Sequence, residues 1–562
     1  MITWGRKRDM SNKQKVLGEL TKSILFLVFG TFLFIPLQAV FTPKWEAAPY
    51  YDYTDRTIRG FLNQSRNSVD VIALGTSHML FGFDSMRLYV DKNIAAYNLG
   101  TTSQPIEVSY YLLETALERQ KPKVVILDIG SLFWNKEHEE EKNKGSRRVI
   151  DALPLMDSKL ALADWYTDEN PQNRTETYLS SVFPMLLYHN RWAELTADDF
   201  TSRFTGDYYA KGYAIKPFIV RAYTSVDYMN YVADIMMDDV ACSFVYSDNG
   251  RQGSVSSDPR YNPIIPEQQK EWLRKIAALC TDYQCTLLLT KIPAIRAPQE
   301  YAGAWTIVKH NAAVQAANEM GLRFVDLLYD ADIGLDIASD FTDGGDHLNF
   351  CGAGKATAAL ENVILEYLDK DDLYPRDQYE KMIPAYKRVT EVAELEMTCS
   401  TEEYFRLLKE REQEIIIGIS VSDEARAGLT ETEMQLLAQL GLKSDFSKEL
   451  HEHDSYIALI DGGIIKHEAV SNRELVYSYC SDDGVKIDLL SSGYFNGSKS
   501  SIQIDGQEYS ENGRGINIVV IDKKSGLVID SLSFDTGSPG PHSANRANWR
   551  NTWFKTFEEQ FV

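Results

Sequence analysis

Two short segments of this chain together carry the side chains that acyl transfer through a serine requires. The segments are Gly75-Thr76-Ser77-His78 and Asp343-Gly344-Gly345-Asp346-His347-Leu348-Asn349. The reaction needs a hydroxyl nucleophile, a base that takes its proton, a group that orients the base, and fixed donors for the oxyanion. Ser77 is the candidate nucleophile and His347 the candidate base, and either Asp343 or Asp346 would orient the imidazole.

The position of Ser77 agrees with this role. It follows residues 69–74, an apolar run typical of a buried parallel strand, and open α/β sheets bind ligands beyond the carboxyl ends of their strands. We expect the backbone N–H groups of Ser77 and of Gly100, which follows the next strand, to hold the oxyanion. We expect His78 to start a helix or to line the cleft, because its backbone position beside Ser77 hinders its reach to the hydroxyl.

Four further side chains are candidates for substrate contacts. His189 and Arg191 lie in an aromatic-rich stretch and could bind an anionic or sugar substrate. Alternatively, this stretch is a helix of the core, and Arg191 is an arginine on its surface. Lys291 ends a strand at the same sheet edge as the nucleophile, where it could bind an acceptor carboxylate or phosphate. Asn349, in the histidine segment, is the fourth candidate.

Composition excludes other classes of function. The net charge of -23 leaves no basic stripe to replace phosphate counterions, which argues against nucleic acid as a partner. The six cysteines form no C-x-x-C pair and no zinc-ligand spacing, so we expect neither a metal nor a cofactor. Cys280 and Cys285 could form a disulfide in an oxidising compartment or remain buried thiols.

The N-terminal region is typical of a membrane anchor. Residues 1–22 are basic, and residues 24–41 carry no charge. We predict a cytoplasmic tail over residues 1–22, a transmembrane helix over residues 23–41, and all later parts on the outer side of the cell membrane. A signal peptide that is cleaved is the alternative.

Alternating strands and helices over residues 65–372 predict an α/β domain with a mostly parallel sheet, which is interrupted by an insertion at about residues 135–265. We predict strands over residues 69–74, 95–99, 123–129, 285–291 and 323–326, and helices over residues 107–119, 266–279 and 301–320.

A helical linker over residues 373–413 then leads to a C-terminal domain over residues 414–562. We predict mixed β structure there, with strands over residues 414–421, 456–460, 485–490, 501–504, 516–522 and 526–534, and one helix over residues 430–440.

The two active-site segments resemble those of the SGNH (GDSL-like) hydrolase superfamily. In that family the nucleophile follows the first strand, a glycine follows the second, and a D-x-x-H block lies near the end, which is the order found here. The similarity is greatest to the membrane-anchored envelope branch, which includes teichoic acid D-alanyl transfer proteins and polysaccharide O-acetyltransferases, through G-[TS]-S and H-L-N-x-x-G-A. The resemblance implies a flavodoxin-like α/β/α domain and the roles given above to Ser77, His347 and Gly100.

The chain departs from the family pattern at two places. The family aspartate lies three residues before the histidine, a position that Gly344 occupies here, so Asp343, Asp346 or no carboxylate at all could complete the site. Many family members also supply an asparagine as a third oxyanion donor. The strand end at residues 128–131, Asp-Ile-Gly-Ser, offers none.

The C-terminal region resembles the interleukin-like EMT inducer (ILEI) domain. Its segments include residues 513–522, R-G-I-N-x-x-x-x-D in pattern, and residues 533–536, Ser-Phe-Asp-Thr. A D-E-A-R segment at residues 423–426 precedes them, whereas in the family it follows, so the domain would be circularly permuted. The resemblance implies a β-sandwich-like domain that binds carbohydrate, and a structural spacer is an equal alternative.

These features predict an extracytoplasmic O-acyltransferase, most simply an O-acetyltransferase, that modifies a cell-surface polysaccharide or teichoic-type glycopolymer through an acyl-Ser77 intermediate. The family resemblance implies a membrane-bound O-acyltransferase as partner. A carbohydrate esterase of the same fold is one alternative, because water could accept the acyl group. A noncatalytic glycan-binding or assembly protein with a degenerate SGNH domain is the other.

Overall fold

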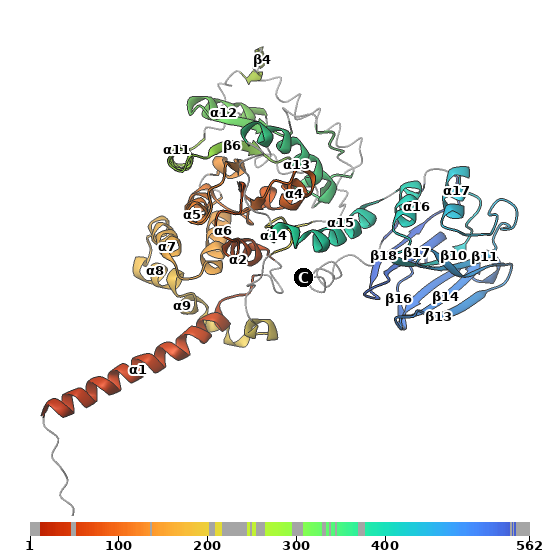
Figure 1. Ribbon diagram of the computed structural model, residues 1–562, viewed down its shortest axis with the longest axis horizontal. Helices are drawn as coiled ribbons and strands as arrows, with labels where there is room; N and C mark the ends of the chain where they lie inside the picture. Colours follow the sequence, from red (N-terminus) through yellow and green to blue (C-terminus); the bar gives the residue numbers. More distant parts are fainter. Residues whose placement is uncertain are drawn as a thin grey trace, which may run out of the picture. The chain divides into compact units, whose positions relative to one another are not determined.

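The computed structural model divides the chain into two compact units (Figure 1). The first comprises residues 1–215 and 220–382, and the second comprises residues 216–219 and 383–562. Within them the structure describes residues 12–45, 52–134, 138–201, 208–215, 244–247, 250–253, 265–294, 307–328, 333–336, 339–342, 345–368, 377–398, 400–539, 542 and 544–546.

The first unit is built on a parallel sheet in which the strand order is β2-β1-β3-β6-β7. The strands are β1 (Val71–Leu74), β2 (Ala96–Asn98), β3 (Val124–Asp128), β6 (Thr286–Lys291) and β7 (Arg323–Asp326). Each falls within a predicted range, so the prediction of a parallel α/β sheet is confirmed. β2 and β3 lie on opposite sides of β1, which makes the carboxyl ends of β1 and β3 the topological switch point of the sheet.

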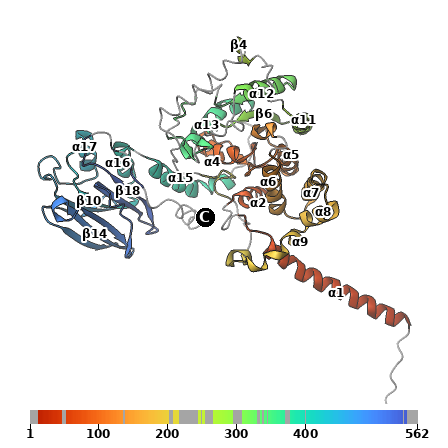
Figure 2. The same ribbon diagram turned by 180° about the vertical axis from the view of Figure 1, so that it is seen from behind.

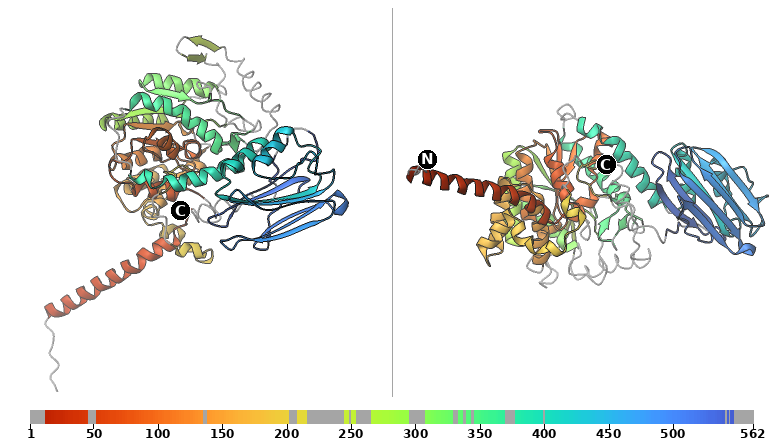
Figure 3. Two further views of the ribbon diagram at one scale, coloured as in Figure 1. Left: turned by 45° about the vertical axis from the view of Figure 1, so that its right-hand side comes forward. Right: turned by 90° about the horizontal axis from the view of Figure 1, so that it is seen from below.

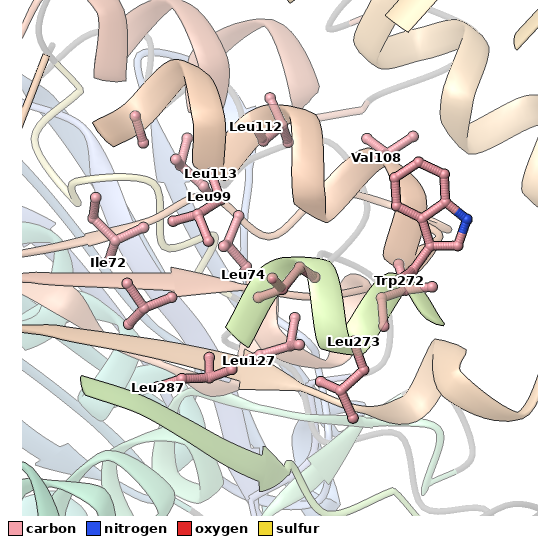
Figure 4. Close-up of a cluster of buried hydrophobic side chains, with 14 of the residues drawn as sticks. Ile72, Leu74, Leu99, Val108, Leu112, Leu113, Leu127, Trp272, Leu273 and Leu287 are labelled. Atoms are coloured by element: carbon pink, nitrogen blue, oxygen red, sulfur yellow. The ribbon is translucent and has the colours of Figure 1, made fainter. Parts of the chain in front are cut away.

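Helices cover both faces of this sheet because its strands are apolar on both sides. Ile72 and Leu74 face a core formed with α12 and with α5 and α11, whose side chains Figure 4 shows, whereas Val71 and Ala73 face a second core formed with α3, α4 and α13. These helices are α3 (Ser77–Gly82), α4 (Ser85–Lys92), α5 (Ile106–Leu117), α11 (Glu267–Asp282), α12 (Ile307–Glu319) and α13 (Phe350–Ile364). Cys280, in α11, and Cys285, directly before β6, are free and buried thiols.

Several short elements lie between β3 and β6, where the alternation of strands and helices is lost in the sequence. They are η1 (Gly130–Phe133), α6 (Glu139–Ala152), α7 (Asp157–Glu169), α8 (Arg174–Val182), α9 (Met185–Tyr188), η3 (His189–Ala193), η4 (Ala197–Phe200), β4 (Phe244–Ser247) and β5 (Gly250–Gly253). Other described elements of the unit are α2 (Thr54–Leu62), β8 (Phe341–Thr342), β9 (His347–Leu348), η9 (Leu365–Tyr367) and α14 (Asp377–Glu380).

The N-terminal helix, α1 (Asn12–Phe41), contains a stretch, Glu19–Phe41, that is long and apolar enough to cross a membrane. Figure 2 shows this helix extending away from the sheet and its covering helices. The expectation of an apolar N-terminal helix is confirmed, and its orientation in a membrane remains a prediction.

The second unit is rich in β structure. It begins with α15 (Ile383–Met397) and α16 (Thr401–Glu410), and α17 (Glu431–Gln439) and η11 (Tyr494–Asn496) are its other helical elements. Its strands are β10 (Ile415–Asp423), β11 (Ser455–Asp461), β12 (Ile464–Ser471), β13 (Leu475–Cys480), β14 (Lys486–Gly493), β15 (Lys499–Ile504), β16 (Gln507–Glu508), β17 (Gly515–Asp522) and β18 (Val528–Phe534).

These strands fold into two layers that enclose an apolar core (Figure 3). The layers join where β10 pairs with β14, over two residue pairs only. Ile416 and Val519 of one layer and Leu489 and Ile502 of the other contribute to the core. The sequence analysis missed β12 and β13, because partly exposed side chains with charged and polar residues among them give these strands little apolar signal.

A buried ion pair holds the last described part of the chain to the second unit. The Arg546 guanidinium donates to both carboxylate oxygens of Asp530, at 3.0 and 2.9 Å, and to the carbonyl oxygens of Leu395 and Thr398. The Tyr404 hydroxyl also donates to Asp530, at 2.9 Å. Asp530 thereby satisfies two buried groups at once.

Replacing Asp530 with alanine should destabilise the second unit by about 3–5 kcal/mol, because it leaves a buried guanidinium without its counter-charge. The matched control is Asp535→Ala, which removes a similar two-pronged contact to Arg514 between exposed side chains and should change stability little. Denaturant titrations, with hydrogen exchange of the β17 and β18 amides as the readout, would measure the stability change in each variant. Equal effects of the two substitutions would contradict the stabilising role that we assign to the buried ion pair of Asp530 and Arg546.

Candidate active site

Ser77 lies at the switch point of the parallel sheet, directly after β1. It is the first residue of α3, and Thr76 caps this helix by accepting a hydrogen bond from the His78 N–H at 3.4 Å. The turn before it depends on Gly75, whose φ of +154° is rare for residues with a side chain. A Cβ at this position would also lie 2.7 Å from the Asp128 Cβ, so the glycine lets the turn pack directly on the end of β3.

His347 and Ser77 are joined by a hydrogen bond. The distance from His347 Nε2 to Ser77 Oγ is 2.8 Å, within the range expected for a nucleophile and its base. His347 is held from two sides, because it pairs with Thr342 in the β8–β9 ladder and its ring contacts the Phe81 ring edge to face, with centroids 5.0 Å apart. The structure therefore brings together the two residues that the sequence placed in these roles.

Asn98 fixes the helix that carries the nucleophile, and this changes the role expected for Gly100. The Asn98 side-chain amide donates to the carbonyl oxygens of Met79 and Phe83, at 2.8 and 2.9 Å, near the end of α3. Its Oδ1 accepts the Gly100 N–H at 2.9 Å. That N–H is thus already used, so the oxyanion role predicted for Gly100 is not supported. The glycine instead allows close packing, because a Cβ there would lie 2.8 Å from the Leu80 nitrogen.

Asn349 also has a different role from the predicted substrate contact. It is fully buried and caps α13, where its Oδ1 accepts the Gly352 N–H at 3.1 Å. Its amide nitrogen donates to the Ser339 carbonyl oxygen at 2.6 Å. This side chain has no surface left for a substrate, and it acts by fixing the loop that carries His347.

Lys291 lies beneath the site, with only 3% of its side chain exposed. Its ammonium nitrogen is 3.8 Å from Asp128 Oδ1 and 3.4 Å from His78 Nδ1. Because a lysine ammonium can only donate, His78 Nδ1 must accept, and the proton of the neutral ring is carried on Nε2. The contact with substrate predicted for Lys291 is therefore replaced by a contact that fixes the tautomer of His78.

His78 is neutral near pH 7. Burial of the ring, and next the positive charge of Lys291, lower its pKa from 6.5 to about 4. Its Nε2 is buried and lies 3.6 Å from Asp346 Oδ1, whose interaction with the ring partly offsets this lowering of the pKa. The site thus contains an N–H donor on a ring close to His347, whose ring centroid is 5.3 Å from that of His78.

His78, Asp346 and His347 are close enough for a metal ion, with ligand atoms that all lie within 4.8 Å of one another. The protonation of His78 does not fit this use, because a metal-binding nitrogen must be free of its proton and the other nitrogen normally donates to an acceptor. Here the other nitrogen faces a lysine. Asp346 lies beside His78, and Asp343 is outside the described residues, so the carboxylate that orients His347 remains a prediction.

His189 and Arg191 are placed against the end of α1. The Arg191 guanidinium donates to the Phe41 carbonyl oxygen at 2.8 Å and to Asp199 at 3.2 Å. His189 is exposed and contacts the Leu186 carbonyl oxygen. Among the contacts of the described residues, none joins either side chain to Ser77 or His347, so their predicted substrate contacts are not supported.

Comparisons with known proteins identify no family for this chain. No family model matches it, and no curated protein matches it. A crystal structure of a proposed acylhydrolase from Bacteroides fragilis is similar to it, with 11% sequence identity and a TM-score of 0.26, over 55% of this chain and 95% of that one. This likeness is too low to assign a fold or an activity, so the function rests on the geometry of the site.

The sequence analysis missed the supporting roles of two residues, Asn98 and Asp128, and the contact between Lys291 and His78. Asn98, Asp128 and Lys291 all lie at the carboxyl ends of strands of the parallel sheet. An asparagine two residues before a glycine was a readable turn signal. The contact between Asp128 and Lys291 could not be predicted without knowing that β3 and β6 are neighbours in the sheet.

His78 should make the folded protein sensitive to acid. The unfolded chain takes up a proton at the ordinary pKa of 6.5, whereas the folded chain does so only at about 4. Stability should therefore fall as the pH falls from 6.5 to 4, by up to about 3 kcal/mol relative to His78→Gln. Unfolding free energies of both proteins across this range would test it, and parallel curves would contradict a neutral, buried His78.

Proposed function

We propose that this protein is a serine-dependent O-acyltransferase, with Ser77 as the transient carrier of the acyl group. The hydrogen bond of 2.8 Å between Ser77 Oγ and His347 Nε2, at the switch point of the sheet, is the observation that carries the proposal. Open α/β sheets bind their ligands at this place, and a hydroxyl paired with an imidazole is the arrangement that acyl transfer needs.

In the first half of the reaction, Ser77 Oγ attacks the carbonyl carbon of an acyl donor while its proton passes to His347 Nε2. The bond between the acyl carbon and the leaving group then breaks, and His347 returns the proton to that group. In the second half, an acceptor hydroxyl gives its proton to His347 and attacks the acyl-serine. The ester bond to Ser77 breaks, and the serine recovers its proton.

We propose His78 as the source of an oxyanion donor that the sequence analysis did not identify. The Gly100 N–H is used by Asn98, and no asparagine follows β3 to serve as a third donor. The Nε2–H of the neutral His78 ring is buried, lies 3.6 Å from Asp346 Oδ1, and belongs to a ring that neighbours the ring of His347. We assign it to the acyl oxygen, where negative charge develops, together with the Ser77 N–H.

The acceptor is proposed to be a hydroxyl of a cell-surface polysaccharide or teichoic-type glycopolymer, and the acyl group to be acetyl. The apolar helix α1 would anchor the protein in the cell membrane with both folded units on the outer side. A membrane-bound O-acyltransferase that carries the acyl group across the membrane is the proposed partner. The second unit would hold the glycan, in keeping with the ILEI-like signature of its sequence.

Incubating the full chain with p-nitrophenyl acetate should add one acetyl group to Ser77, detectable by intact-mass analysis and peptide mapping. Adding a candidate glycan should discharge the adduct faster than water does and should yield O-acetylated glycan. Ser77→Ala should give no adduct, and Ser109→Ala, which changes a buried serine of α5, is the matched control that should keep it.

Discharge of the adduct to water alone would favour a carbohydrate esterase. Equal adduct formation in wild type and Ser77→Ala would exclude Ser77 from the mechanism. A folded protein without any adduct or turnover would favour a noncatalytic glycan-binding or assembly protein.

Substitutions of His78 should separate its hydrogen bond from its volume. His78→Leu removes the donor and should slow acylation of Ser77 by about 10²–10³-fold, with little change in KM for the donor ester. His78→Gln keeps an N–H group and should retain much of the rate. Rapid-mixing measurement of p-nitrophenol release would give both values, and an equal loss in the two variants would show that His78 acts only through packing.

A further inference from the structure

A group of large apolar side chains lies exposed beside the outer end of α1. We call residues 183–200, which include α9, η3 and η4, the juxtamembrane segment. Its exposed apolar side chains are Leu186 (47%), Leu187 (45%), Trp192 (72%) and Phe200 (68%). Tryptophan is enriched where a membrane protein meets the lipid headgroups. Phenylalanine and leucine accompany it on the apolar face of helices that lie at this boundary.

The juxtamembrane segment packs along one face of α1. The Phe183 ring meets the Phe34 ring at 5.6 Å, the Met185 N–H donates to Gln38 Oε1 at 2.9 Å, and Arg191 donates to the Phe41 carbonyl oxygen at 2.8 Å. Residues 34, 38 and 41 are spaced by four and three positions, so they share one side of the helix. Figures 1 and 2 both show α9 beside this end of α1.

These contacts set the depth of the segment relative to a membrane. The uncharged part of α1, residues 23–41, is about 28 Å long at 1.5 Å per residue, which matches a hydrocarbon core. Phe34 lies about 10 Å along the helix from Phe41. A segment that touches both must therefore enter the same leaflet as this end of α1.

We infer that the juxtamembrane segment is a second membrane-contacting element, which lies at the boundary between headgroups and acyl chains on the side of the folded units. The inference rests on the proposed anchoring by α1. The bilayer is the occupant that the exposed side chains fit, because their segment contacts a helix that is long and apolar enough to span it.

The polar groups of the segment suit this location. Arg191 is neutralised by Asp199, and both side chains are largely buried. Asp199 also accepts the Thr196 N–H at 2.9 Å and so closes the short helix η4. The remaining charged and amide side chains, among them Glu194 and Asn190, are exposed and can reach headgroups or water.

A buried cluster ties the juxtamembrane segment to the folded unit. The Tyr188 hydroxyl donates to Asp151 at 2.7 Å, and the Arg147 guanidinium contacts both residues. Burial, and next the charge of Asp151, raise the pKa of Tyr188 well above its ordinary value, so the hydroxyl remains a donor. Lipid contact by the segment would therefore hold α6 at a fixed height above the bilayer.

Photo-crosslinking of the full chain in vesicles of phosphatidylcholine and phosphatidylglycerol would test this inference. Benzoylphenylalanine would replace, one at a time, Trp192, Phe200, Ile35 as a position in the apolar helix, and Tyr283 as an exposed aromatic control. Ile35 is 65% and Tyr283 45% exposed. Tyr283 ends α11, which Figures 1 and 2 place away from α1.

We expect lipid adducts by mass spectrometry at positions 35, 192 and 200, at least tenfold above position 283. Adducts at 35 without adducts at 192 and 200 would overturn the inference, as would crosslinks from 192 and 200 to a second copy of the chain. Absence of lipid at 35 would overturn the anchor and the inference together. Acetyl labelling of Ser77 in the same samples reports the proposed chemistry separately and shows that each variant is folded.

Discussion

The electrostatic environment of one buried lysine organises the candidate site. An ammonium group that leaves water is destabilising unless a counter-charge and hydrogen bonds compensate it. Asp128 provides that charge to Lys291, and it is itself fixed because its carboxylate accepts the backbone N–H groups of Ile292 and Gly130, at 3.0 and 3.2 Å. The absence of a side chain at Gly75 lets Asp128 pack directly beneath the turn that presents the nucleophile.

The same pair gives two neighbouring histidines different properties. His78 is buried against Lys291 and stays neutral, with its remaining proton on the nitrogen away from the lysine. His347 Nε2 is hydrogen-bonded to Ser77 Oγ, and the residue belongs to the short antiparallel pair of β8 and β9. One ring is thus suited to donate a hydrogen bond without changing its charge, and the other to take and return a proton. Environment, and not residue type, separates the two roles.

Much of the fold could be predicted from the sequence, because buried parallel strands and amphipathic helices leave clear apolar patterns. The sequence also indicated that Ser77 and His347 could form a pair. Ser77 directly follows an apolar strand, and His347 lies in a loop with acidic residues on its N-terminal side. The roles of Gly100 and Asn349 were misjudged, because each depends on a hydrogen bond that its residue type only permits. Arg191 could not be placed at all, since its partner Phe41 lies 150 positions away.

A path of direct contacts links α1 to the nucleophile within the first unit. The juxtamembrane segment bonds to α6 through Tyr188 and Asp151, and α6 packs so closely on the loop after β2 that a Cβ at Gly145 would lie 1.8 Å from the Ser103 carbonyl oxygen. Two residues earlier, the Thr101 N–H donates to the Gly75 carbonyl oxygen at 3.1 Å. Each step is a packed or hydrogen-bonded contact, so Ser77 is connected to α1 through the folded unit. Under the proposed function, these contacts would restrict the orientations in which an acyl donor at the membrane meets Ser77, which would lower the entropic part of the barrier to transfer.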